Sequence, residues 1–160
     1  MKQLRIILNT TLAVFSLGAS QAFADPYAVG SKVASFSATD QHGAAFTFDA
    51  KDTRYLLVSF DMETGKKANA ALNALGKDYL SGKHAVYVAN IHGMPAVGRF
   101  FALPKMRKYA HRIILGDDAN LLAPYPQQAG KVTVLKLDDA QVRKVSYWDP
   151  SAEGLDALLK

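Results

Sequence analysis

The amino-acid sequence predicts an α/β domain in which a central mixed β-sheet is flanked by helices. Residues 55–60 (YLLVSF) and 85–91 (AVYVANI) are short, almost continuous apolar runs, and an amphipathic helical pattern lies between them. Such runs are typical of strands buried on both faces of a sheet, and a helical connection makes them parallel neighbours. Alternating segments nearer the two ends of the chain predict antiparallel hairpins, one of them an N-terminal edge hairpin.

The first 24 residues are typical of a secretory signal peptide. Lys2 and Arg5 give a basic start, residues 6–18 are mostly apolar, and residues 22–24 (AFA) form a small-x-small cleavage site. The apolar run is shorter than the roughly 20 residues that a membrane-spanning helix needs. We therefore expect cleavage after Ala24, a periplasmic mature protein with no membrane span, and a single domain over residues 25–160; an uncleaved anchor is the alternative.

The 160-residue chain contains no cysteine, and its formal net charge is +5. Without cysteine, thiol–disulfide exchange, thiolate metal ligation and thioether haem attachment are excluded. Basic residues gather between Lys105 and Lys108, with His111 and Arg112 just beyond. They are more typical of a solvated helix end than of an anion site, and nucleic acid is not an expected partner of an exported protein with no larger basic surface.

The first half of the chain follows this plan in order. The expected elements are a loop over 28–36 that leads into an edge strand, a turn at 39–43, a partner strand at 45–49, the buried strand 55–60, a polar turn at 61–67, one helix from there to Leu80, a turn at 80–83 and the buried strand 85–91. Asp61 or Thr64 is expected to cap the helix, because short polar side chains accept hydrogen bonds from the free N–H groups of a first turn.

The second half is predicted to complete the sheet. The expected elements are a helix over 96–103, a third parallel strand at 112–115, a single helical turn over 119–123 capped by Asp118, a hairpin of strands 132–137 and 142–148 around a turn at 138–141, and a last helix from Pro150 that buries Leu155, Leu158 and Leu159. The helix over 96–103 is expected to bury Val97, Phe100, Phe101 and Leu103, and Pro104 is expected to kink it or to start a new turn.

This order of elements resembles thioredoxin-like proteins of the peroxiredoxin and cytochrome-maturation type. Redox members of that group place Cys-x-x-Cys at the start of the helix after the first buried strand, where this chain has approximately Gly65 and Ala68. The peroxiredoxin motif Pro-x-x-x-Thr-x-x-Cys, registered on Thr64, puts Phe60 at the proline and Lys67 at the peroxidatic cysteine. The resemblance therefore implies the fold without the redox chemistry.

A second landmark of the group, a cis-proline before the strand matched by residues 132–137, is replaced by Val132-Thr133. A narrower resemblance is to small periplasmic thioredoxin-fold proteins of the YtfJ type, which also lack the active-site cysteine pair. The stretches that carry it are residues 63–72, 88–91, 94–98, 100–101 and 132–138. This resemblance implies no established activity; some relatives bear names that mention flavin dehydrogenases, but no Gly-x-Gly-x-x-Gly opens the first helix here.

Ligands of open α/β sheets bind beyond the carboxyl ends of the strands. This rule predicts a binding surface made of three neighbouring loops, with the residues Asp61, Met62, Glu63, Thr64, Gly65, Lys66, Lys67, His92, Met94, Pro95, Lys131 and Val132. Its expected partner is a periplasmic protein or a small anionic ligand, since N–H groups of the helix after Gly65, together with Lys66 and Lys67, suit an anion.

Two chemical alternatives remain open at this stage. His92 and Met94, with Met62 or His42, offer nitrogen and sulfur ligands of the kind that copper prefers, so a copper carrier or a flavin- or copper-dependent oxidoreductase is the second interpretation. Asp61 and Glu63 offer a carboxylate pair, but a capping aspartate and a solvated glutamate is the simpler interpretation. The main prediction is a non-redox binding module with no catalytic, cofactor or metal residue.

Overall fold

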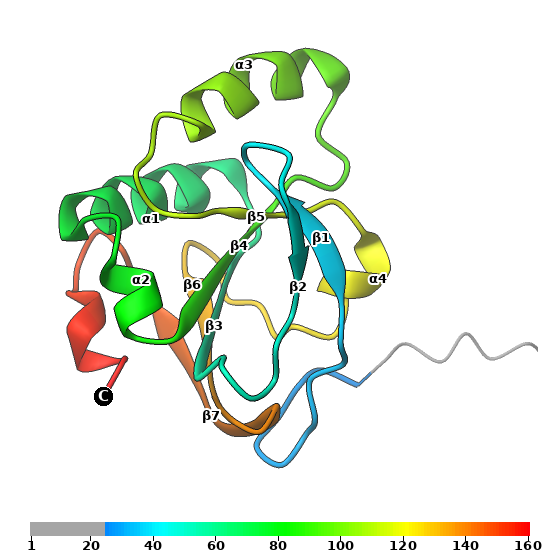
Figure 1. Ribbon diagram of the computed structural model, residues 1–160, viewed down its shortest axis with the longest axis vertical. Helices are drawn as coiled ribbons and strands as arrows, with labels where there is room; N and C mark the ends of the chain where they lie inside the picture. The colour runs from blue at the N-terminus through cyan, green and yellow to red at the C-terminus, as the bar shows by residue number, and fades with distance from the viewer. Residues whose placement is uncertain (1–24) are drawn as a thin grey trace, which may run out of the picture.

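The computed structural model describes residues 25–160; the predicted signal peptide lies outside this range. One seven-stranded mixed sheet runs through the molecule in the order β2-β1-β5-β4-β3-β6-β7 (Figure 1). The strands are β1 (Ser37–Asp40), β2 (Ala45–Thr47), β3 (Tyr55–Ser59), β4 (Ala85–Asn90), β5 (Ile114–Gly116), β6 (Val132–Asp138) and β7 (Gln141–Trp148). The helices are α1 (Met62–Leu75), α2 (Tyr79–Gly82), α3 (Ala96–Met106), α4 (Ala119–Leu122) and the 3-10 turn η1 (Leu155–Ala157).

The mixed sheet confirms the predicted α/β class. β3, β4 and β5 are parallel to one another, and β3 also pairs antiparallel with β6, which forms a hairpin with β7. At the other edge, β1 pairs antiparallel with both β5 and β2. β4 is the middle strand of the seven, and its neighbour β3 is buried at all five of its residues. None of the helices in the described part of the chain is long and apolar enough to cross a membrane.

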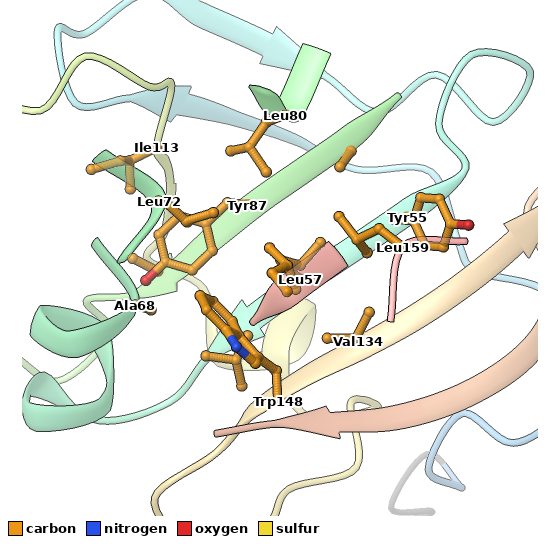
Figure 2. Close-up of a cluster of buried hydrophobic side chains, with 14 of the residues drawn as sticks. Tyr55, Leu57, Ala68, Leu72, Leu80, Tyr87, Ile113, Val134, Trp148 and Leu159 are labelled. Atoms are coloured by element: carbon orange, nitrogen blue, oxygen red, sulfur yellow. The ribbon is translucent and has the colours of Figure 1, made fainter. Parts of the chain in front are cut away.

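The sheet is covered on both faces, and alternate residues of β3 point to opposite sides. Leu57 belongs to a cluster with Leu72 of α1, Trp148 of β7 and Leu159 near the C-terminus (Figure 2). Leu56 belongs to a second cluster on the opposite face, whose other members include Leu122, Tyr125, Leu135 and Val142. Alternation of side chains in a strand gives one face to each cluster.

The predicted N-terminal edge hairpin is confirmed, since β1 begins at Ser37 and pairs antiparallel with β2, but β1 extends through Asp40 and so into the turn predicted from Thr39. The loop before β1 lies along the β6–β7 turn. The Gly30 amide donates to the Val142 carbonyl at 2.8 Å, and the Val33 amide donates to the Ala140 carbonyl at 2.9 Å. Backbone groups of this segment are therefore satisfied at the opposite edge of the sheet, a pairing that local sequence does not encode.

The helix after β3 begins earlier and ends earlier than predicted. α1 starts at Met62, so the expected polar turn over residues 61–67 is its first turn and a half. It ends at Leu75, before Gly76, whose φ of +93° is readily adopted only by glycine, and Tyr79–Gly82 form the separate short helix α2. The glycine at position 76 is the feature of the sequence that indicates the break between α1 and α2.

The C-terminal hairpin is confirmed, but the last helix is not. β6 and β7 join through Asp139 and Ala140, whose φ values of +47° and +62° are those of a tight hairpin turn. The helix expected from Pro150 is only the 3-10 turn η1, which follows Gly154. Leu155 and Leu159 still reach the core, whereas Leu158 is half-buried.

α3 differs most from its prediction. Pro104 lies inside the helix, which continues to Met106. Val97, Phe100 and Phe101 were expected in the core, but they are 71%, 75% and 61% exposed. Figure 1 shows α3 next to α1 at one end of the molecule rather than over the centre of the sheet. Its apolar stripe therefore faces outward instead of joining either core cluster.

Candidate functional site

A cavity of about 230 Å³ lies between α1 and α3, beyond the carboxyl ends of β3 and β4. Its apolar lining consists of Met62, Ala89, Ile91, Met94, Gly98, Phe101, Ala102 and Met106. Its polar and charged lining consists of Ser59, Asp61, Lys66, Asn69, Asn90, Lys105 and Tyr109, and Gly65 completes the lining. The sheet supplies the floor of this cavity and the two helices supply its sides, so its shape depends on how α3 is held against α1.

Asp61 lies just after β3, at the edge of the cavity, and caps the N-terminus of α1. Its Oδ1 accepts from the Thr64 amide at 2.8 Å, and its Oδ2 accepts from the Thr64 hydroxyl at 2.7 Å. The hydrogen bond from the Thr64 amide is the main cause that lowers the pKa of the Asp61 carboxyl, so the group is ionised at neutral pH. The predicted cap is confirmed, and both carboxylate oxygens are occupied by the first turn of α1.

Below α1, a buried polar pair joins the two central strands. The hydroxyl groups of Ser59 on β3 and Tyr87 on β4 share a hydrogen bond of 2.8 Å, and burial raises the pKa of the Tyr87 phenol. Gly65 lies directly over this pair: a Cβ there would be 3.5 Å from Ser59 Oγ and 3.9 Å from the Tyr87 hydroxyl. These are ordinary van der Waals distances, so a methyl group would fit between α1 and the polar pair.

A second buried polar pair links α1 to the segment that precedes β5. Asn69 Oδ1 lies 3.0 Å from His111 Nε2, and His111 is completely buried. Burial lowers the pKa of the imidazole to about 4, so the ring is neutral at pH 7. Its single N–H belongs on Nε2, where it donates to Asn69, because the unpartnered Nδ1 then remains an acceptor rather than an unsatisfied donor.

Arg99 holds α3 in place. Its guanidinium forms a two-point pair with Asp117, with 2.6 Å between Nη2 and Oδ1, and this contact raises the pKa of Arg99 and lowers that of Asp117. The same side chain donates to the Met94 carbonyl at 3.0 Å and to the Ile91 carbonyl at 3.2 Å. One arginine therefore joins α3, the loop after β4 and the segment after β5.

Only part of the predicted binding surface lines the cavity. The predicted residues that do so are Asp61, Met62, Gly65, Lys66 and Met94. The predicted residues that do not are Glu63, Thr64, Lys67, His92, Pro95, Lys131 and Val132. Thr64 and Val132 are buried, whereas Glu63 and Lys67 form an exposed ion pair of 3.1 Å on the outer side of α1.

The contribution of α3 and of the deeper part of α1 to the cavity was not predicted from the sequence. Asn69 follows Gly65 by four residues and Met62 by seven, so helical spacing alone places these three residues on one face. Phe101 and Lys105 have the same four-residue spacing on α3. This spacing could have identified these residues, but the face of α3 that carries Phe101 was expected to pack into the core.

The basic cluster between Lys105 and Arg112 is not one solvated surface. His111 is buried, the Arg107 Nε donates to the Gln41 carbonyl at 3.0 Å, and the Arg112 Nε donates to Asp40 Oδ2 at 2.9 Å. These contacts attach the segment after α3 to the β1–β2 hairpin. Of this cluster, only Lys105 borders the cavity between α1 and α3.

The residues of the copper interpretation are divided between the cavity and the surface. Met62 and Met94 line the cavity, whereas His92 and His42 are exposed and outside the lining. Among residues 25–160, no three His, Asp or Glu side chains are grouped as a metal site would require.

Comparisons with known proteins identify the fold. No protein-family model and no curated protein matches the chain. A putative thiol:disulfide interchange protein DsbE from Chlorobium tepidum is similar, with a TM-score of 0.60, 13% identity, and coverage of 83% of this chain and 95% of that one. Peroxidoxin BcpB from Mycobacterium tuberculosis gives a TM-score of 0.57, 17% identity, and coverage of 83% and 94%.

The thioredoxin domain of a thiol-disulfide oxidoreductase from Bacteroides vulgatus gives a TM-score of 0.53, 15% identity, and coverage of 83% and 99%. The protein has a thioredoxin-like fold. On sequence, the Cys-x-x-Cys pair of redox members is matched approximately to Gly65 and Ala68, which lie within the first two turns of α1. Neither position holds a cysteine, and residues 25–160 contain no cis peptide bond.

Proposed function

We propose that this chain is an exported thioredoxin-fold binding module, of the YtfJ type, that acts without redox chemistry. The observation that carries the proposal is the cavity at the start of α1: the fold keeps an accessible site where redox relatives carry cysteines, and this chain has no cysteine anywhere. A protein without a thiolate cannot form the mixed disulfide on which thiol–disulfide exchange depends. Binding is the function that such a site can retain.

The surface around the cavity supports a binding role. Met62 on α1 is 54% exposed and Phe101 on α3 is 61% exposed, and both line the cavity. Phe100 and Val97 continue this apolar surface along α3. Exposed aromatic residues beside a concave site are characteristic of binding surfaces, because soluble domains otherwise bury large apolar side chains.

Export to the periplasm and cleavage after Ala24 belong to this proposal. They rest on the basic start, the apolar run and the small-x-small site of residues 1–24. Intact mass measurement of protein recovered from the periplasm is expected to show a chain that begins at Asp25. A mass that includes residues 1–24 would instead favour the uncleaved anchor.

The binding role is tested by position-specific photocrosslinking in cells that export the protein. A photoreactive phenylalanine analogue in place of Phe101 is expected to give a defined adduct. The same analogue in place of Val29, which is 68% exposed in the N-terminal segment at the far end of the molecule from α3, is the matched control (Figure 1). Equal adducts at both positions, or none at Phe101, would contradict a binding site between α1 and α3.

The absence of redox chemistry is tested with the purified protein. Insulin-disulfide reduction and peroxide consumption are both expected to proceed at the rate of the protein-free control. Turnover above that rate, retained after gel filtration, would replace the binding module by an oxidoreductase.

A further inference from the structure

The cavity between α1 and α3 combines an apolar interior with positive charge. Ile91, Met94, Phe101 and Met106 supply large apolar side chains from the floor and from α3. At about 230 Å³ the cavity is smaller than the roughly 300–1,000 Å³ typical of sites for drug-sized molecules. Its occupant is therefore a small molecule, or the end of a larger one, with an apolar body.

Two lysines border this apolar space, one from each helix. Lys66 of α1 and Lys105 of α3 are both exposed and both line the cavity. Neither belongs to any of the ion pairs formed within residues 25–160, whereas the adjacent Lys67 is paired with Glu63. The cavity thus has two cationic groups available to a ligand.

Asn69 adds a hydrogen-bond donor inside the cavity. The residue is 95% buried, since its relative exposure is 5%, and its Oδ1 is occupied by His111. The amide nitrogen Nδ2 forms no hydrogen bond within the described residues, and it is not among their fully enclosed unpartnered atoms. Because Asn69 lines the cavity, this N–H₂ group is the polar atom that a bound acceptor can reach.

The negative charge of Asp61 does not outweigh the positive charge of Lys66 and Lys105. Among residues 25–160 this aspartate is the only acidic residue that lines the cavity, and both of its oxygens accept hydrogen bonds from Thr64. Two lysines against one carboxylate leave the lining with a net positive charge, and the available donor of Asn69 also favours a ligand that accepts hydrogen bonds.

We propose that the cavity binds a small organic acid: a carboxylate held by Lys66, Lys105 and Asn69, with an aromatic or aliphatic body packed among the apolar side chains. This inference rests on the proposed binding function and names the class of ligand. The capping geometry of α1 is not part of the recognition, since Asp61 already satisfies the Thr64 amide.

The proposal is tested by nuclear magnetic resonance titration of the exported protein with 3-phenylpropionate. The acid is expected to shift the side-chain amide signals of Asn69 and the backbone signals of residues that line the cavity. Acetate, which lacks the apolar body, and 3-phenylpropan-1-ol, which lacks the charge, are each expected to bind roughly tenfold more weakly or worse.

A pair of double variants separates specific contacts from overall charge. Lys66→Gln with Lys105→Gln is expected to weaken 3-phenylpropionate binding by roughly tenfold. Lys67→Gln with Lys108→Gln removes the same charge from the same two regions outside the cavity lining, and is expected to change binding by no more than about twofold. Equal weakening by the two double variants would overturn the proposal.

Two further comparisons show whether the carboxylate belongs to a free acid or to a peptide. They also show whether a negative result concerns only the small-acid proposal or the binding function as well. A tripeptide Ala-Ala-Phe with a free C-terminal carboxylate is expected to bind no better than 3-phenylpropionate. If the peptide bound and the free acid did not, the small-acid proposal would be wrong. Equal binding of the acid and the alcohol would also overturn it, whereas a Phe101 crosslink obtained in the same protein would leave the binding module itself intact.

Discussion

The two long helices of this domain, α1 and α3, lie side by side but are held by different means. α1 buries Thr64, Gly65, Ala68, Asn69 and Leu72, so one whole face belongs to the core or the site floor. α3 fully buries only Met106 and exposes its largest apolar residues. It is instead held at one end by the contacts of Arg99 and at the other by Met106 and Arg107.

This difference explains where the site lies. A helix anchored along its length cannot move from the sheet without losing core contacts, whereas a helix anchored at its ends can leave a gap beneath its middle. The cavity is that gap, bounded by Gly98, Phe101 and Lys105 on α3 and by Met62 and Lys66 on α1. The core therefore fixes one wall of the site, and polar contacts fix the other.

The largest expected contrast is between Leu72 of α1 and Phe100 of α3. Leu72→Ala removes a side chain that is 1% exposed and is expected to lower the free energy of unfolding by about 2–5 kcal/mol. Phe100→Ala removes a larger side chain that is 75% exposed, and is expected to change it by less than about 0.5 kcal/mol. Urea unfolding of both variants is the measurement. A large loss in Phe100→Ala would mean that α3 packs as α1 does.

The contact of α1 with His111 predicts a pH dependence of stability. The pKa of His111 is about 4 in the folded protein and near 6.5 in an unfolded chain, so the unfolded chain binds more protons between these values. The contribution of the neutral His111 to the free energy of unfolding is therefore fully present above pH 6.5. It is expected to fall by about 3 kcal/mol as the pH is lowered to 4.

Unfolding measured across pH 4–7 in the protein and in His111→Gln tests this prediction. Glutamine can still donate to Asn69 but does not titrate, so the slope in this window is expected to flatten. The lowered pKa values of Asp40, Asp61 and Asp117 act at lower pH and are common to both proteins. Parallel profiles would rule out His111 as the group responsible.

A smaller effect on overall stability is expected from Arg99→Met, because α3 contributes little to the core. The variant loses the pair with Asp117 and the bonds to the Ile91 and Met94 carbonyls. Amide hydrogen exchange is expected to accelerate several-fold in α3 and to stay unchanged in α1. Equal acceleration in both helices would show that they open as one unit.

The smallest contrast is between two helix glycines. Alanine favours a helix interior over glycine by about 1 kcal/mol, so Gly65→Ala is expected to raise the free energy of unfolding by up to that amount, since its Cβ meets nothing closer than 3.5 Å. In Gly98→Ala the new Cβ lies 3.0 Å from Met94 Cγ, so the methionine must shift and the gain is expected to be smaller. Urea unfolding compares the two. An equal gain would show that Met94 moves freely.

The two central strands of this protein follow from its local sequence. Residues 55–59 and 85–90 are almost continuous apolar runs, typical of strands covered on both faces, and the Asp61 and Asp118 caps depend on neighbours within three residues. The absence of cysteine is also read directly from the sequence. Each of these features depends on local chemistry or on composition.

Long-range contacts determine which face of α3 turns outward and which polar residues meet in the cavity. An apolar stripe such as Val97, Phe100 and Phe101 has the same periodicity whether it packs on a core or borders a site. Its orientation is set by Arg99 and Asp117, 18 residues apart, and the position of Asn69 in the α1 wall of the cavity is set by His111, 42 residues away. Contacts at such separations arise from the fold, so helical periodicity could not report them.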